Sequence, residues 1–508
     1  MVVVVVLAVL AVVSLLVAAH WYVWRRLVRD TTSAPGTARR LGTVAIILLP
    51  VLSVGALSSS RSGAPFLLQQ VLAWPGFLWL ATLLYLVLAL GVAEAVRPAL
   101  RRFLARRDAT GKTPEPTTPT GPRDVAATEA SAAAKTGAAA KAKAEAETEA
   151  KSGTAAGTAT KTEIGTGTGT GTAKESESGT GTKTESGIGT KTGTKTGTKT
   201  GTGTAKESET KAGTAAAPTA PPSAPSASPA TPSGPSRRLF VSRAVGGAAA
   251  TAALATVGYG TYGVLRGPSV KRVTVPLAKL PRAAHGFRIA VVSDIHLGPI
   301  LGSAHTRRIV RTINSTRPDL IAVVGDLVDG TVQNLGPAAE PLAGLEAPHG
   351  SFFVTGNHEY FSGAAEWVDH VRELGLRPLE NERVEIAGFD LAGVNDIAGE
   401  SEGEGPDFVK ALGDRDPARA SVLLAHQPVV IHDAVRHGVD LQLSGHTHGG
   451  QLWPGSLLAG FANPTVAGLE RYQDTQLYVS RGAGAWGPPV RVGAPSDITV
   501  VELASRQA

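Results

Sequence analysis

The C-terminal half of the sequence predicts an α/β fold, and two features of its pattern support this prediction. Several short runs of valine, isoleucine and leucine each stop at a polar motif, and helical stretches such as 306–314 and 364–374 lie between these runs. Runs that are apolar throughout are typical of strands buried on both faces, as strands are in α/β proteins. We expect this α/β domain to occupy residues 270–508.

The length of the chain, 508 residues, predicts at least two independent units, because one hydrophobic core rarely grows so large. The net charge of +7 is unevenly spread. Residues 272–508 contain 19 lysines and arginines against 27 aspartates and glutamates, so this part is acidic. The basic surplus lies beside apolar segments and in the linker, which fits membrane topology and anionic lipid. We therefore expect no nucleic-acid partner.

The chain has no cysteine. This excludes disulfides, thiolate metal ligands and a cysteine nucleophile. Any metal must be held by histidine, aspartate, glutamate or asparagine.

Residues 1–107 are predicted to form a membrane region with three transmembrane helices. Three apolar runs lie at 1–23, 43–57 and 66–96, and arginines cluster after the first and the third. Lysine and arginine favour cytoplasmic loops, so these clusters place the ends of the first and third runs inside the cell. The first run lacks the basic start of a signal peptide, and we expect it to span the membrane rather than to be cleaved.

Residues 236–266 contain paired arginines, Arg237 and Arg238, followed by a weakly apolar helix. This pattern resembles a twin-arginine export signal, and it also fits a fourth transmembrane helix. Whether the segment 241–265 is cleaved stays open. Both interpretations put the following domain on the extracytoplasmic side of the cell membrane.

Residues 108–235 consist largely of Gly-Thr and Lys-Thr repeats and a proline-rich end. No hydrophobic periodicity runs through them, so no core can offset the entropy of ordering the chain. We expect a low-complexity, disordered linker.

Five apolar runs in the C-terminal half lead into motifs of the residue types that bind metals. The motifs are Asp294-Ile295-His296, Gly325-Asp326-Leu327-Val328-Asp329, Gly356-Asn357-His358-Glu359, His426-Gln427-Pro428 and Gly445-His446-Thr447-His448. Ligands of α/β folds bind beyond the carboxyl ends of strands. We therefore expect the motifs along one edge of a sheet, with the preceding glycines allowing sharp backbone turns.

The residue types also suggest how two cations are shared. Divalent cations accept carboxylate and imidazole ligands. Two cations about 3.5–4 Å apart need an anionic group between them, and Asp326 is the natural bridging carboxylate. Asp294 and His296 stand two residues apart, so on an extended strand they share a face. The same spacing lets His446 and His448 serve different metals.

Together, in this order and each after a strand, the five motifs resemble the calcineurin-like metallophosphoesterase superfamily. The closing Gly-His-Thr-His-Gly-Gly-Gln, with the later Ser480-Arg481-Gly482, is most similar to its bacterial membrane-associated or exported branch. The resemblance covers nearly half of the chain. It implies a four-layer β-sandwich of mixed sheets flanked by helices, here preceded by transmembrane helices and the disordered linker.

The resemblance also implies a role for each residue. One metal would bind Asp294, His296 and His448, the other Asn357, His426 and His446, and Asp326 would bridge the two. A bridging hydroxide would attack phosphorus, and His358 would act as a non-ligand catalyst. Asp329 and Glu359 would orient the ligands or His358. The cofactors would be two divalent ions, with Mn, Fe, Zn and Mg all compatible with these ligands.

The sequence therefore predicts a membrane-tethered hydrolase of phosphodiester or pyrophosphate bonds. A lipid-linked or envelope substrate fits a domain beside a membrane. The alternatives are a phosphomonoesterase or protein phosphatase, and a non-catalytic metal-binding membrane receptor. The oligomeric state is unknown. We expect Trp453 and Trp486 to pack in the core rather than to line a lipid site, and Arg481 is compatible with either a phosphate contact or an ion pair.

Overall fold

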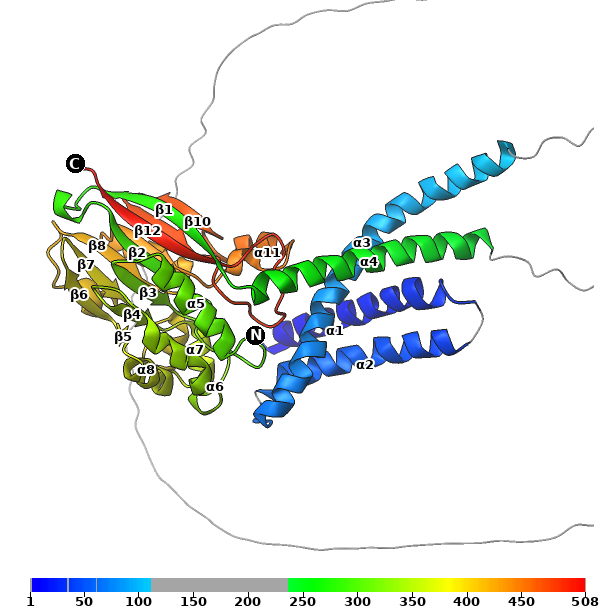
Figure 1. The fold of residues 1–508 in the computed structure, drawn as a ribbon, viewed down its shortest axis with the longest axis horizontal. Helices are drawn as coiled ribbons and strands as arrows, with labels where there is room; N and C mark the ends of the chain where they lie inside the picture. Colours follow the sequence, from blue (N-terminus) through cyan, green and yellow to red (C-terminus); the bar gives the residue numbers. More distant parts are fainter. Residues whose placement is uncertain (1, 34–35, 61, 111–235, 508) are drawn as a thin grey trace, which may run out of the picture. The chain divides into compact units, whose positions relative to one another are not determined.

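The computed structural model describes residues 2–33, 36–60, 62–110 and 236–507. The linker predicted for 108–235 therefore lies, from residue 111 onward, outside the described residues. The helices before residue 111 and the chain from 236 onward belong to one compact unit. This unit consists of four long helices and an α/β domain (Figure 1).

Four long helices make up what we call the helical module. They are α1 (Val2–Val23), α2 (Thr37–Ser59), α3 (Phe66–Thr110) and α4 (Arg237–Leu265). A π-helical turn over Trp24–Arg29 continues α1, and α3 packs against the other three helices. All four are long and apolar enough to cross a membrane. The described residues therefore contain four candidate spans, at the three apolar runs and at the fourth segment that the sequence indicated.

Twelve strands of the α/β domain form two six-stranded sheets. The first sheet has the order β1-β12-β2-β3-β4-β5 and the second β10-β11-β9-β8-β7-β6. Strands of the first sheet are β1 (Ser269–Leu277), β2 (Phe287–Val292), β3 (Leu320–Val324), β4 (Ser351–Val354), β5 (Arg377–Pro378) and β12 (Asp497–Ser505). Those of the second are β6 (Glu382–Ile386), β7 (Phe389–Gly393), β8 (Ala420–Leu424), β9 (Leu441–Ser444), β10 (Gly468–Tyr472) and β11 (Thr475–Val479). Both sheets mix parallel and antiparallel pairs.

Successive residues of the central strands enter different cores, which explains why these strands are apolar throughout. In β2, Ile289 and Val291 join the core between the two sheets, whereas Ala290 and Val292 join the core under the helices. Side chains alternate between the faces of a strand, so a strand covered on both faces must be apolar at every position.

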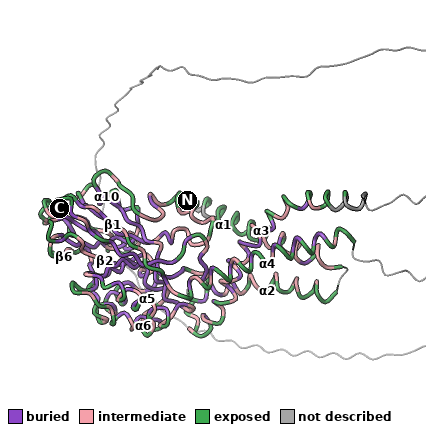
Figure 2. The backbone as a smooth tube through the Cα atoms, turned by 45° about the horizontal axis from the view of Figure 1, so that its top comes forward, coloured by how far each residue is buried: buried purple, intermediate pink, exposed green. Residues whose placement is uncertain are grey.

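Helices cover the outer face of each sheet. Helices α5 (Ser303–Ser315), α6 (Val332–Ala339) and α8 (Ala364–Glu373) bury side chains such as Ile309 and Trp367 against the first sheet. Helices α9 (Phe408–Leu412) and α10 (Ile431–Arg436) bury Phe408 and Ile431 against the second. The order helix, sheet, sheet, helix confirms the predicted four-layer α/β sandwich, and its interior is the most buried part in Figure 2.

Candidate metal centre

All seven predicted ligands stand just beyond the carboxyl ends of five strands. Asp294 and His296 follow β2, Asp326 follows β3, and Asn357 follows β4 as the first residue of the short helix α7 (Asn357–Ser362). His426 follows β8, while His446 and His448 follow β9. The expectation of one sheet edge was wrong, because β2, β3 and β4 belong to the first sheet and β8 and β9 to the second. Stacking of the two sheets brings the two edges together.

Five of the seven residues adopt left-handed backbone conformations. The positive φ angles are 51° at Asp294, 48° at His296, 54° at Asp326, 72° at His446 and 53° at His448. Such conformations cost on the order of 1–3 kcal/mol each and concentrate at functional sites. The spacing of Asp294 and His296 suggested that they share one face of an extended strand, and this expectation was wrong. β2 ends at Val292, and the chain then curls along the segment after β3, with the His296 amide donating to the Asp326 carbonyl at 3.1 Å.

The three glycines that precede ligands serve two different purposes. Gly325 has φ of +71°, so it makes the expected turn. Gly356 and Gly445 have no positive φ, but a Cβ on Gly356 would collide with Asp326, and one on Gly445 with Ser293 and Asp294. These two glycines let other ligands approach the backbone closely.

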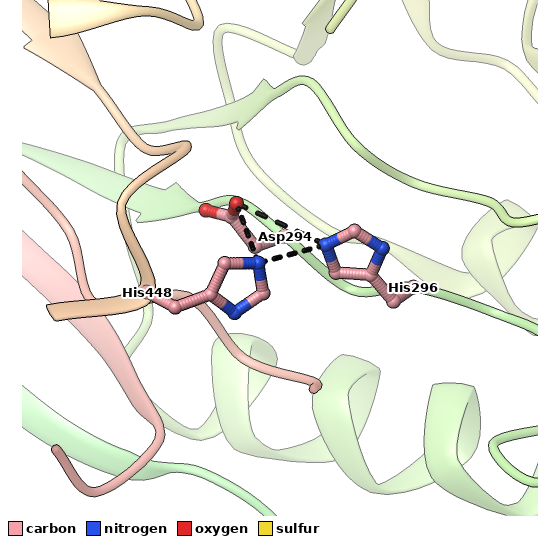
Figure 3. Close-up of side chains that lie close together, drawn as sticks. All are labelled: Asp294, His296 and His448. Carbon is pink, nitrogen blue, oxygen red and sulfur yellow. Dashed lines mark hydrogen bonds and ion pairs between the residues drawn. The ribbon is translucent and has the colours of Figure 1, made fainter. Parts of the chain in front are cut away.

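One group of ligands consists of Asp294, His296 and His448, which point toward one another (Figure 3). The Nε2 atoms of the two histidines lie 2.9 Å apart. Asp294 Oδ1 lies 3.3 Å from Nε2 of His448 and 4.0 Å from Nε2 of His296. All three residues are buried.

A second group contains Asp326, His426 and His446. Asp326 Oδ2 lies 3.1 Å from Nε2 of His426, and His446 Nδ1 lies 3.0 Å from Oδ1 of Asn357. The same Asp326 oxygen is 3.7 Å from Nε2 of His296 in the first group. Asp326 therefore stands between the two groups, where the sequence predicted a bridging carboxylate.

The donor atoms fit divalent cations. Imidazole nitrogens, carboxylate oxygens and an amide oxygen are ligands that Mn, Fe, Zn and Mg accept in different proportions. Nε2 of His426 is buried, and its polar neighbour among the described residues is the Asp326 carboxylate at 3.1 Å, without good hydrogen-bond geometry. A cation held between Asp326 and His426 would satisfy it. These His/Asp groups are typical of a binuclear metallophosphoesterase site.

The pKa values separate the histidines into two kinds. Burial lowers the pKa of His446 to about 4, helped by the neighbouring His426, and burial together with His296 holds the pKa of His448 well below its usual value. Burial also lowers the pKa of His296, but the carboxylates of Asp329, Asp326 and Asp294 outweigh this effect and raise the pKa to about 9. Neutral imidazole is the metal-binding form, so His446 and His448 already stand in that form at neutral pH.

His358 lies beside both groups without belonging to the predicted ligand set. Its Nδ1 is 2.7 Å from Oδ1 of Asp329, and the same oxygen is 2.9 Å from Nδ1 of His296. The backbone amide of His358 donates to Asp326 Oδ1 at 2.9 Å. The Asp329 carboxylate thus contacts a predicted ligand and His358 with the same oxygen.

Glu359 acts on backbone amides rather than on ligand side chains. Its carboxylate accepts hydrogen bonds from the amides of Asp326, Leu327 and Gly356, at 3.0, 2.7 and 2.6 Å. Burial and the nearby Asp326 raise the pKa of Glu359 to about 7. It holds the loops after β3 and β4 in register.

Sequence reasoning missed Arg491. Its guanidinium lies 3.0 Å from Nδ1 of His448 and donates to the His448 carbonyl at 3.1 Å. Arg491 is buried, but no motif surrounds it in the sequence, so only the fold brings it to the site. Arg481, for which a phosphate contact was considered, forms an ion pair at 4.0 Å with Asp497.

Trp453 and Trp486 contradict the expectation of core packing. Their exposed fractions are 56% and 57%. The ring of Trp486 lies 5.8 Å from that of His358 in an edge contact. The exposed Phe361 flanks the same histidine at 5.6 Å.

Comparison with known proteins agrees with this geometry. Residues 287–450 match the model of the calcineurin-like phosphoesterase family. A zebrafish protein described as a transmembrane protein with metallophosphoesterase domain is 38% identical over 267 residues, which cover 50% of this chain and 61% of that protein. A metallophosphoesterase of Helicobacter pylori is 39% identical over 256 residues, covering 49% of this chain and 68% of that protein.

A metallophosphoesterase of Aquifex aeolicus is 36% identical over 239 residues, covering 46% of this chain and 91% of that protein. The relatives come from bacteria and animals, so the similarity is not confined to the bacterial branch named from the motifs. The chain therefore belongs to the calcineurin-like phosphoesterase family, as a membrane-anchored metallophosphoesterase, a hydrolase of phosphoester bonds with a His/Asp metal site.

Proposed function

We propose that the protein hydrolyses phosphodiester or pyrophosphate bonds at a two-metal centre, with a lipid or envelope molecule as substrate. The observation that carries this proposal is the position of His358 beside two ligand groups that Asp326 joins. The side chains in ring contact with His358, among the described residues, are His296, Phe361 and Trp486. A group leaving on this side would meet the exposed apolar rings of Phe361 and Trp486, which suits an ester with an apolar part.

We assign Asp294, His296 and His448 to one cation, Asn357, His426 and His446 to the other, and Asp326 to both. When bound, the cations would supply Lewis-acid activation of the phosphoryl group and of the attacking water. Mn, Fe, Zn and Mg all suit these ligands, and elemental analysis of the purified chain identifies the ions. A metal content well below two ions per chain after loading would contradict the assignment.

His358 has the geometry of a general acid. Asp329 occupies its Nδ1, which leaves Nε2 to donate a proton to the departing oxygen. General acid catalysis contributes typically about 10²–10⁴-fold to a rate. A leaving group that is a weak base departs readily without a proton, so its release depends less on a general acid.

The test compares bis-aryl and mono-aryl phosphates with added Mn²⁺. We expect faster turnover of the diester, and a His358→Ala variant should lose on the order of 10²-fold with an alkyl leaving group but much less with nitrophenolate. Faster turnover of the monoester would instead favour a phosphomonoesterase. No turnover of either ester by metal-loaded protein would favour a receptor.

We also propose that the catalytic domain lies on the extracytoplasmic side. Near its beginning, α4 lies beside the π-helical turn that continues α1, and Arg243 donates to the carbonyl of Thr31 just after this turn at 3.0 Å. Arg26 and Arg97 pair with Glu94 in the same region of the module. Near its end, α4 contacts the catalytic domain, where the Arg491 amide donates to the Gly260 carbonyl. Between Arg243 and Gly260 the helix advances about 26 Å, close to the thickness of the hydrocarbon core.

The arginine-rich end of the module and the catalytic domain therefore lie near opposite ends of α4. Because arginines mark the cytoplasmic side, this supports an outer location for the domain. The chain has no cysteine, so a Val409→Cys variant carries a single thiol on the exposed surface of α9. A membrane-impermeant maleimide should label it in intact cells. Labelling only after cell lysis would place the domain inside.

A further inference from the structure

Helix α11 (Gly455–Ala462) is apolar, and none of its residues is buried. Leu457, Leu458 and Phe461 are 67%, 73% and 89% exposed. Large apolar side chains grouped on a surface mark an interaction site, whereas single ones do not. The helix therefore lacks a covering partner among the described residues.

Both ends of α11 are attached to the metal-binding motif. The start of the helix packs on Gly450, two residues after His448, where a Cβ would collide with the backbone of Ser456. After the helix, the Val466 carbonyl accepts a hydrogen bond of 2.6 Å from the hydroxyl of Thr447. Thr447 stands between the ligands His446 and His448, so α11 keeps a fixed position relative to the metal centre.

The segment just before α11 touches the helical module. The Tyr85 hydroxyl of α3 donates to the Trp453 carbonyl at 3.1 Å. Leu452, Val490 and Val492 share one apolar cluster with side chains of α1, α2, α3 and α4. Tyr85 and Gly260, which contact these loops, both lie within candidate membrane spans. The loops around α11 are therefore continuous with the surface of the spans.

Charged side chains are absent from the two segments that form this region. Residues 449–469 and 482–490 contain no Asp, Glu, Lys, Arg or His. An ordinary water-facing surface mixes charges with apolar groups. Exposed tryptophans next to apolar residues are typical of the interfacial layer of a bilayer, where the ring is half in hydrocarbon and half in water.

We propose that α11, together with Trp453 and Trp486, is embedded in the interfacial layer of the bilayer that the helical module spans. The occupant of this apolar surface is the phospholipid membrane itself. Trp486 contacts His358, so the catalytic side of the metal centre opens at the lipid surface. A phosphate ester whose apolar part stays in the bilayer reaches the metals without leaving it. This last point rests on the proposed function, but the position of α11 does not.

The test measures depth rather than hydrolysis, so its failure and the failure of the proposed activity are distinguishable. A Leu458→Cys variant of the full chain is labelled with an environment-sensitive fluorophore and placed in nanodiscs of phosphatidylcholine and phosphatidylglycerol. Nitroxide groups on the lipids, near the headgroup or along the acyl chain, quench a label that lies among them. Phe461→Cys gives a second, independent position.

The matched control is Val409→Cys. Val409 is also exposed, at 70%, but its helix α9 packs on β6 and β7 at the far edge of the second sheet. We expect quenching at position 458 to exceed that at 409 several-fold, strongest for nitroxides near the headgroup, because interfacial helices lie about 5–10 Å deep. Equal, weak quenching at both positions would overturn the proposal, as would crosslinking of position 458 to a second chain without quenching.

Discussion

The helical module and the catalytic domain place the same apolar side chains in opposite positions. In the catalytic domain, Ile289, Phe353 and Leu391 are fully buried. In the module, Leu15, Ile47 and Val54 are between 63% and 71% exposed although they lie in the middle of helices. Green exposed stretches accordingly run along α1 and α2 in Figure 2. The side chains of the domain are therefore arranged for water, and those of the module are arranged for lipid.

The pairing of charges also differs between the two regions. In the module, the Glu94 carboxylate lies between Arg26 and Arg97 at 2.9 and 3.1 Å, so the charges pair with one another. In the catalytic domain, Asp294 and Asp326 face histidines whose nitrogens converge on common points. The first arrangement already pairs opposite charges, whereas the second needs cations to balance it.

Replacing one carboxylate in each region tests this contrast between charges. Asp326→Asn should lower turnover by at least about 10³-fold, because Lewis-acid stabilisation is worth several kcal/mol and each 1.4 kcal/mol is tenfold. Its metal content should also fall. The matched change Glu94→Gln, again carboxylate to amide, should leave both quantities near those of the parent. Turnover is measured as the rate on a bis-aryl phosphate, and metal content is measured by elemental analysis. Equal losses in both variants would contradict the proposed difference between the two carboxylates.

A smaller effect tests the exposed apolar side chains. Leu48 is 50% exposed near the middle of α2. An arginine at the centre of a membrane helix costs about 3 kcal/mol, or on the order of 100-fold in the insertion equilibrium. Leu48→Arg should therefore reduce the amount of chain recovered in carbonate-washed membranes. Val409→Arg, at an exposed apolar position in the catalytic domain, should not, and similar losses would show that the module is not lipid-facing.

The smallest effect concerns the contact between the two regions. A Cβ at Gly260 would lie 2.6 Å from Val490 Cγ1 and 2.9 Å from the Arg491 carbonyl oxygen. Gly260→Ala should destabilise the protein by about 1–3 kcal/mol through overpacking. Gly258→Ala, where nothing lies within 4 Å, should be neutral or stabilising by up to about 1 kcal/mol. Thermal unfolding in nanodiscs measures both, and identical melting temperatures would argue against this packing.

The sequence alone predicted the α/β class, which the structure confirms, and it named seven candidate ligands and His358, which the fold brings close together. It could do so because strands buried on both faces are apolar at every position, and because ligand types at strand ends form short local motifs. The four apolar helices were equally visible, since length and hydropathy are properties of a continuous segment. The arginines that distinguish their two ends were visible for the same reason.

Which of these segments come into contact depends on the folded chain. It divided the ligands between two sheets, although the sequence pattern suggested one edge, because strand pairing is a long-range property. It brought Arg491 against His448 from a region without any motif. It also left Trp453 and Trp486 exposed, where composition favoured the core. Whether a side chain faces protein, water or lipid depends on what packs over it, and the residue type does not record that.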